Sequence, residues 1–158
     1  MRISRISALA SGLTLFAASL ATLASPPPSD WQNAPVCNGK YSARMKHTFS
    51  ETATTAGVRT EASVVRNPFA QGSFPNPTYY LAEAEVSSRS DVHPNWVSDS
   101  QSRDGYNSYS AEPAQVGTVV FKNSGCKLVG TARVSVQCPG SAAIETKEFS
   151  RTWDGCGL

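Results

Sequence analysis

The chain has 158 residues, a length that suits one domain with one hydrophobic core. Its 14 Lys and Arg exceed its 12 Asp and Glu by two, and Arg2 and Arg5 account for that excess. Because no basic cluster forms elsewhere, a surface that neutralises phosphates is excluded, and no nucleic-acid partner is expected.

Residues 1–24 have the pattern of a secretory signal peptide. Arg2 and Arg5 precede a charge-free stretch from Ala8 to Ala24, and small residues lie ahead of Ser25, where cleavage is expected. The stretch is shorter than the ~20 apolar residues that a spanning helix needs. We therefore expect cleavage, a secreted or periplasmic product, and no stable membrane insertion.

Residues 25–36 form a Pro/Ser-rich lead-in that includes three consecutive prolines. Such a run favours an extended spacer over a helix. A single disulfide-bonded domain is predicted to follow, from residue 37 to residue 158.

The rest of the chain shows period-two alternation of apolar and polar residues. Strands are predicted at 41–49, 58–64, 80–86, 116–120, 126–138 and 143–153. Alternation with polar outward faces is typical of antiparallel sheets that have one face in water. The sequence predicts an all-β protein, an antiparallel β-sandwich or small barrel of about six to eight strands with two disulfides.

Four cysteines in an exported chain favour two disulfides. Cys126 and Cys138 would lie ~40 Å apart on one strand, whereas a disulfide allows a Cα separation of only ~7 Å at most. A hairpin through "CPGSA", centred near residue 141, places Cys126 opposite Cys156. Cys126–Cys156 and Cys37–Cys138 are the predicted pairs, and spacing alone leaves the two other connectivities open.

Motifs for catalysis are missing: the chain has no Gly-rich phosphate loop, no nucleophile elbow and no His-Glu-x-x-His. His47 lies on the apolar side of strand 41–49 and is interpreted as a packing residue. His93, with Asp91 nearby, is the candidate base for a hydrolase, but the Pro94 and Asn95 that follow it favour a turn. We expect no metal and no cofactor, and a non-catalytic role is favoured over an enzymatic one.

Two long loops are predicted, at residues 67–80 and 93–113. The second combines aromatic and amide or acidic side chains, which is typical of adaptable recognition surfaces. Its candidate ligand-binding residues are Trp96, Asp104, Tyr106, Asn107 and Tyr109. Alternatively, the aromatic side chains cap the core. The loops leave opposite ends of one strand, ~30 Å apart, so two separate surfaces are expected.

These features predict an exported, non-catalytic recognition module that binds a protein or glycan partner through aromatic-rich loops. The alternative is a secreted inhibitor or toxin-like effector, in which the prolines between residues 68 and 77 stiffen an inserting loop. A hydrolase ranks third. The sequence leaves the oligomeric state open.

Overall fold

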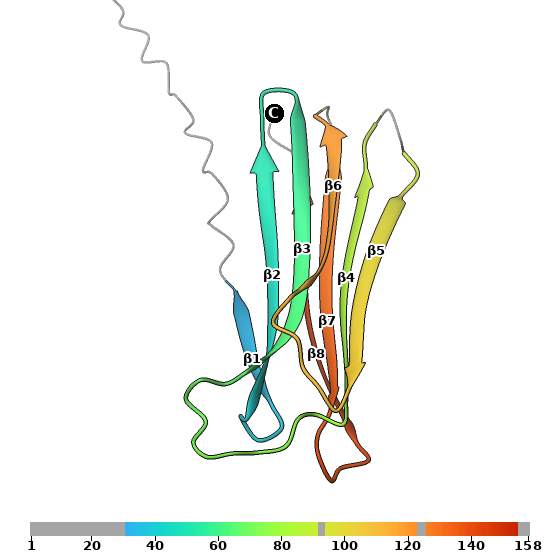
Figure 1. The fold of residues 1–158 in the computed structure, drawn as a ribbon. Helices are drawn as coiled ribbons and strands as arrows, with labels where there is room; N and C mark the ends of the chain where they lie inside the picture. Colours follow the sequence, from blue (N-terminus) through green and yellow to red (C-terminus); the bar gives the residue numbers. More distant parts are fainter. Residues whose placement is uncertain (1–30, 92–93, 123–125, 155–158) are drawn as a thin grey trace, which may run out of the picture.

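The computed structural model describes residues 31–91, 94–122 and 126–154, and these form an all-β fold of eight strands without a helix (Figure 1). The predicted signal peptide and the first part of the lead-in lie outside the described residues. The strands are β1 (Gln32–Val36), β2 (Tyr41–Glu51), β3 (Thr55–Arg66), β4 (Tyr79–Arg89), β5 (Val97–Tyr106), β6 (Ala114–Phe121), β7 (Lys127–Gln137) and β8 (Ile144–Asp154).

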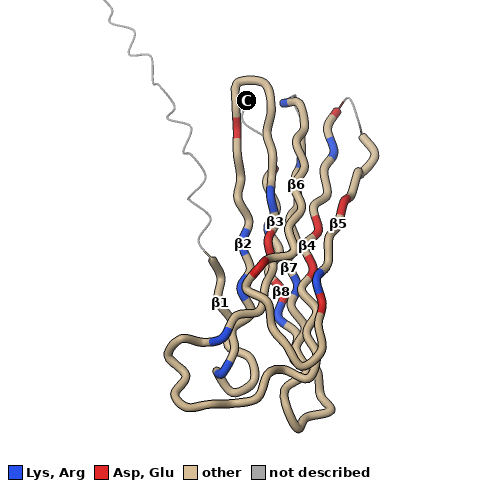
Figure 2. Tube along the Cα trace, in the orientation of Figure 1, with Lys and Arg blue, Asp and Glu red and all other residues tan. Residues whose placement is uncertain are grey.

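The strands form two four-stranded sheets. Sheet A has the order β1-β2-β3-β6, sheet B has the order β5-β4-β7-β8, and every pairing is antiparallel. The chain crosses between the sheets after β3, β5 and β6, so the sheets lie face to face in a sandwich-like arrangement (Figure 1). Charged residues of both signs are interspersed along the strands (Figure 2). The predicted all-β class is confirmed. The six strands predicted from the sequence correspond to β2, β3, β4, β6, β7 and β8.

The core lies between the sheets and follows the predicted alternation. On β7, Leu128, Ala132, Val134 and Val136 are completely buried and Gly130 is buried too, while the residues that alternate with these five are partly or fully exposed. β2 and β4 show the same pattern. Burial of the apolar faces of β2, β3, β4 and β7 is the main stabilising term, because it removes apolar surface from water.

His47 lies in the middle of this core and is only 1% exposed. Its Nε2 is 3.0 Å from the carbonyl oxygen of Phe149, and its Nδ1 is 3.0 Å from the hydroxyl of Thr60. A carbonyl only accepts hydrogen bonds, so Nε2 carries the proton and Nδ1 accepts from Thr60. Burial lowers the pKa of His47 and keeps the ring neutral. The prediction of a packing histidine is confirmed.

This neutral histidine makes the stability dependent on pH. Its pKa in the folded state lies below the ordinary 6.5, so the unfolded chain binds a proton first as the pH falls. The stabilisation is complete above pH ~6.5 and is lost as the pH falls from there toward the folded-state pKa. Urea unfolding across this window should show the loss. His47→Gln should flatten the dependence, and an equally steep dependence in that variant would contradict the assignment.

The prediction of one continuous loop at residues 93–113 is wrong, because residues 97–106 form β5 and pair with β4. Every residue from Val97 to Ser102 is exposed. A strand at the edge of a sheet, with neither face buried, needs no apolar alternation, and so its sequence carries no strand signal. The loop at residues 67–78 is confirmed.

The lead-in also contains a strand. Residues 32–36 form β1, which pairs with β2 at the edge of sheet A. The domain therefore begins before residue 37, upstream of the predicted boundary. Pro35 is compatible with this position because an edge strand does not need every backbone N–H for pairing.

The Cys37–Cys138 disulfide is confirmed, with an S–S distance of 2.08 Å and a Cα–Cα distance of 5.3 Å. It joins the turn between β1 and β2 in sheet A to the turn between β7 and β8 in sheet B. The predicted hairpin is confirmed as well, since Gln137 pairs with Ile144. The described residues contain this one disulfide where two were predicted. Cys156 lies outside them, and Cys126–Cys156 stays a prediction.

Candidate functional site

The five predicted ligand-binding residues do not form one cluster. Trp96 precedes β5, Asp104 and Tyr106 lie at its far end, and Asn107 and Tyr109 lie in the loop after it. Trp96 and Tyr106 are ten residues apart along an extended chain, or ~33 Å. Because β5 runs back along β4, its end returns to the side of the molecule that carries the loop 67–78 (Figure 1).

Tyr106 forms an aromatic pair with Tyr79 on the outer face of sheet B. The two residues pair across β4 and β5, and their ring centroids are 5.0 Å apart. Tyr106 is 73% exposed, so its ring offers a surface to a ligand. Partial burial, with a smaller contribution from Asp104, raises the pKa of Tyr79 and keeps its hydroxyl protonated.

Asn107 and Tyr109 have structural contacts away from this face. Asn107 adopts a left-handed φ of 50°, its backbone N–H donates to Thr78, and its carbonyl accepts from Asn76. The ring of Tyr109 packs 5.4 Å from that of Tyr41. This contact agrees with the alternative interpretation, in which Tyr109 caps the core.

Trp96 lies at the opposite end of sheet B. The guanidinium of Arg89 is 5.1 Å from the centroid of its ring. The pairing of β4 with β5 ends at Ser88 and Val97, so Arg89 and Trp96 continue the same register by one step. Trp96 and Tyr106 therefore mark the two ends of the outer face of sheet B along β5.

Between these ends the outer face is polar. Along β4 and β5, cross-strand pairs run from Tyr79–Tyr106 through Leu81–Asp104 and Glu83–Ser102 to Glu85–Ser100. A shallow hollow of about 260 Å³ lies in the middle, lined by Glu83, Ala84, Glu85, Ser100, Gln101, Ser102, Thr131 and Arg133. The face thus combines an aromatic pair, in which Tyr106 is exposed, with carboxylates and hydroxyls.

Hydrogen bonds organise much of this face. Two N–H groups of Arg133 donate to one carboxylate oxygen of Glu148, at 2.7 and 2.9 Å, and this raises the pKa of Arg133. Cross-strand hydroxyl pairs form at Ser87–Ser98, Thr131–Ser150 and Ser135–Thr146. None of the ion pairs in the described part of the chain includes Glu83 or Glu85. Their carboxylates are therefore available as acceptors.

Sequence reasoning missed Tyr79, Glu83, Glu85 and Arg133 as members of this surface. The alternation already placed Glu83, Glu85 and Arg133 on polar outward faces of their predicted strands. It did not indicate that β4 lies between β5 and β7, which brings these side chains together. The sequence carries no local signal for the order of the strands in the sheet, and that order is what brings these residues together.

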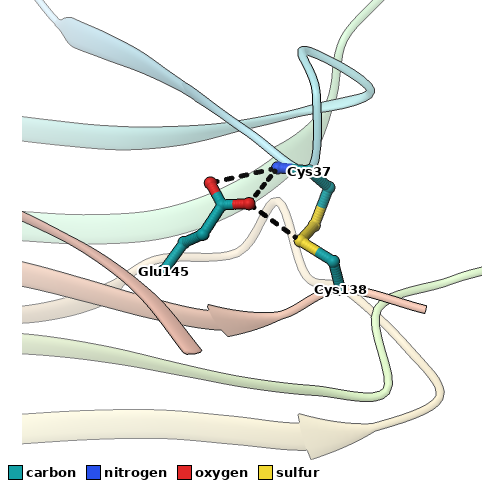
Figure 3. Close-up of side chains that lie close together, drawn as sticks. All are labelled: Cys37, Cys138 and Glu145. Carbon is teal, nitrogen blue, oxygen red and sulfur yellow. Dashed lines mark hydrogen bonds between the residues drawn. A yellow bond between two sulfur atoms is a disulfide. The ribbon is translucent and has the colours of Figure 1, made fainter. Parts of the chain in front are cut away.

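A second cluster surrounds the disulfide, where Glu145 lies against both half-cystines (Figure 3). The backbone N–H of Cys37 donates to the Glu145 carboxylate at 3.3 Å, and one carboxylate oxygen is 3.2 Å from Sγ of Cys138. Potential metal-ligand atoms of these three residues lie within 4.8 Å of one another. Because both sulfurs are in the disulfide, neither is a thiolate that could bind a metal.

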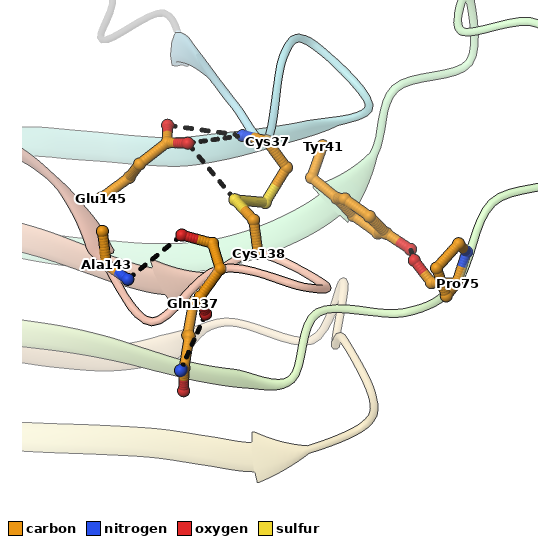
Figure 4. Close-up of a disulfide and its surroundings, with 8 residues drawn as sticks. Cys37, Tyr41, Pro75, Gln137, Cys138, Ala143 and Glu145 are labelled. Atoms are coloured by element: carbon orange, nitrogen blue, oxygen red, sulfur yellow. Dashed lines mark hydrogen bonds between the residues drawn. A yellow bond between two sulfur atoms is a disulfide. The ribbon is translucent and has the colours of Figure 1, made fainter.

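The surroundings of the disulfide also indicate a structural role. Cys37 begins a turn with left-handed φ values at Cys37, Asn38 and Gly39. Nearby, the Tyr41 hydroxyl donates to the carbonyl of Pro75 (Figure 4). In the turn that follows β7, the side-chain amide of Gln137 donates to the carbonyl of Ser141, and the backbone N–H of Ala143 donates to the Ser141 hydroxyl. The Glu145 carboxylate would repel an attacking thiolate, which slows disulfide exchange.

His93, the candidate hydrolase base, lies outside the described residues. No helix long and apolar enough to cross a bilayer is found in the described part of the chain. Comparison with protein-family models, with curated proteins and with solved structures gave no match.

Proposed function

We propose that the protein is an exported, non-catalytic recognition module for a protein or glycan partner, and that the outer face of sheet B is its binding surface. The Cys37–Cys138 disulfide supports an oxidising compartment such as the periplasm or the extracellular space. The observation that carries the proposal is the exposed ring of Tyr106, paired with the partly buried Tyr79 beside the carboxylates of β4 and β5.

The chemistry of this face favours a hydroxyl-rich ligand, and therefore a glycan. A tyrosine ring offers an apolar surface on which a sugar ring can stack, with a polar hydroxyl at its end. Asp104 pairs with Leu81, and Glu83 and Glu85 follow Leu81 along β4 at intervals of two residues, or ~7 Å each. The three carboxylates can accept hydrogen bonds from successive hydroxyls. The surface is open, so it suits a chain better than a small enclosed ligand.

Tyr106→Ala is the direct test. The variant should lower the free energy of unfolding by no more than ~1 kcal/mol, because the side chain is exposed and loses the contact with the ring of Tyr79. It should weaken binding by ~2 kcal/mol, about 30-fold in Kd, if Tyr106 is an anchor. Binding is measured on a panel of immobilised oligosaccharides, with capture of proteins from extract as a parallel arm.

Tyr109→Ala is the matched control. It removes the same side chain from a ring that packs against Tyr41, so it should lower stability by ~1–2 kcal/mol and leave binding unchanged. Glycan binding that survives both Tyr106→Ala and Glu83→Gln would contradict this surface. Capture of a protein alone, lost in the Tyr106 variant, would assign the same face to a protein partner.

A second candidate function, a secreted inhibitor, is favoured by Phe69. This side chain is 90% exposed, at the start of the loop 67–78. Its backbone N–H donates to the side chain of Asn67, whose own amide group donates to the carbonyl of Gly39 at 2.7 Å. The loop thus exposes an apolar side chain on a turn that these two hydrogen bonds stabilise. Loss of the captured protein in Phe69→Ala, with Tyr106→Ala unaffected, would favour this function.

A further inference from the structure

Among the described edge strands, β6 alone contains neither a charged residue nor a proline. Unprotected edges pair with other strands, and proteins usually block them with charges or proline. β1 contains Pro35, β5 contains Asp99, Arg103 and Asp104, and β8 contains Glu145, Lys147, Glu148, Arg151 and Asp154. β6 reads AQVGTVVF and contains neither a charge nor a proline.

The free side of β6 is identified by one hydrogen bond. The backbone N–H of Gln115 donates to the side chain of Gln101 in β5, on the side away from β3. Alternate residues of an antiparallel strand face the same neighbour, so the amides of Gly117, Val119 and Phe121 also point away from β3. Among the described strands, β6 pairs with β3 alone.

The same edge exposes apolar surface. Val119 is 68% exposed and Phe121 is 74% exposed. Beside them lies a groove of about 400 Å³ lined by Ser88, Arg89, Ser90, Val97 and residues 118–121. On the inner side, Val116 and Val120 are only partly buried, whereas Val58 in the adjacent β3 is buried. Covering this edge would remove apolar surface from water.

Among the described residues, no close neighbour explains the glycine at position 117. A Cβ on Gly117 would come no closer than 3.4 Å to another atom, which is an ordinary contact. At Gly57, Gly105 and Gly130 the corresponding distances are 3.0, 2.5 and 2.6 Å, so close neighbours account for those glycines. Glycine inside a strand weakens it and often marks the close approach of another backbone. At Gly117 the described residues supply no such neighbour.

We propose that a second copy of the protein pairs with this edge, β6 against β6 in antiparallel orientation. With the two-fold axis at Thr118, Gly117 faces the partner's Val119 on the outer side and leaves room for it. On the inner side, Val116 faces the partner's Val120. These β-branched pairs cover the groove beside β6 in each of the two copies. Two identical edges without charge meet with no ionic repulsion, and sheet A becomes one continuous eight-stranded sheet.

The oligomeric state of the mature protein tests this proposal. Sedimentation or light scattering over a range of concentrations should show a monomer–dimer equilibrium. Val119→Lys should weaken it because a charge would be placed at the pairing edge. Gly117→Val should weaken it about tenfold or more, because the added side chain meets the partner's Val119. Gly117→Val should keep its thermal midpoint at dilution, which excludes misfolding as the cause.

Ile144→Lys is the control, since it places the same charge on an exposed apolar residue of another edge strand, β8. It should leave the dimer unchanged. A wild type that is monomeric at every concentration would overturn the proposal, and so would a dimer that survives both β6 variants. Open-ended growth beyond the dimer would also overturn it, since a two-fold contact closes on itself. None of these outcomes depends on the outer face of sheet B.

Discussion

Replacing both Cys37 and Cys138 with serine is expected to lower the free energy of unfolding by about 4–5 kcal/mol. The bond joins residues 101 positions apart, and a cross-link that closes a loop of about 100 residues removes ~4.7 kcal/mol of chain entropy from the unfolded state. Domains are typically stable by only ~5–15 kcal/mol. Urea unfolding of the double variant should therefore show a large fall in the midpoint.

Asn38→Gly is the control for this variant. It changes the same turn without touching a sulfur, and glycine accepts the left-handed φ of 53° at this position. Its unfolding midpoint should stay close to that of the wild type. If the double serine variant also kept that midpoint, the two turns would have to be held together by packing alone, and the role assigned to the disulfide would be wrong.

Gly130→Val is expected to have the largest effect of a single substitution, a loss of ~3 kcal/mol or more. A Cβ at this position would lie 2.6 Å from Oγ1 of Thr60 and 2.7 Å from Nδ1 of His47. Both groups are buried and hydrogen-bonded to each other. The ring must move to relieve the overlap, which adds overpacking strain to the loss of its bond to Phe149. Thermal unfolding measures the effect.

Gly117→Ala provides the comparison, because a Cβ there meets no atom closer than 3.4 Å. In dilute solution this variant should be as stable as the wild type, or more stable by ~0.5 kcal/mol. A Gly130→Val protein that unfolds at the wild-type temperature would show that the centre of the core tolerates an added side chain. The tight packing around His47 would then be excluded.

The candidate surface was predicted in part. Tyr106 and Asp104 were chosen from the composition of their segment, and both lie on the outer face of sheet B. The same reasoning grouped them with Tyr109, whose ring packs on Tyr41 instead. Composition identifies aromatic residues among polar ones, but it does not distinguish an exposed ring from one that caps the core, because both occur in polar segments.

The sequence by itself determined the elements whose signal is local. In β2, β4 and β7 the alternation corresponds to one buried face, and in β6 and β8 it corresponds to a face that is only partly buried. β3 was also predicted, although both of its faces are largely buried. The Pro-Gly turn after Cys138 predicted the hairpin between β7 and β8, and this cysteine pairs with Cys37. Only the tertiary structure decided the rest. β5 has no buried face to leave a pattern, and the order β5-β4-β7-β8 depends on contacts between distant segments. The candidate surface follows from that order, and the edge position of β6 follows from the order β1-β2-β3-β6 of sheet A. Pairing between distant strands has no counterpart in local periodicity.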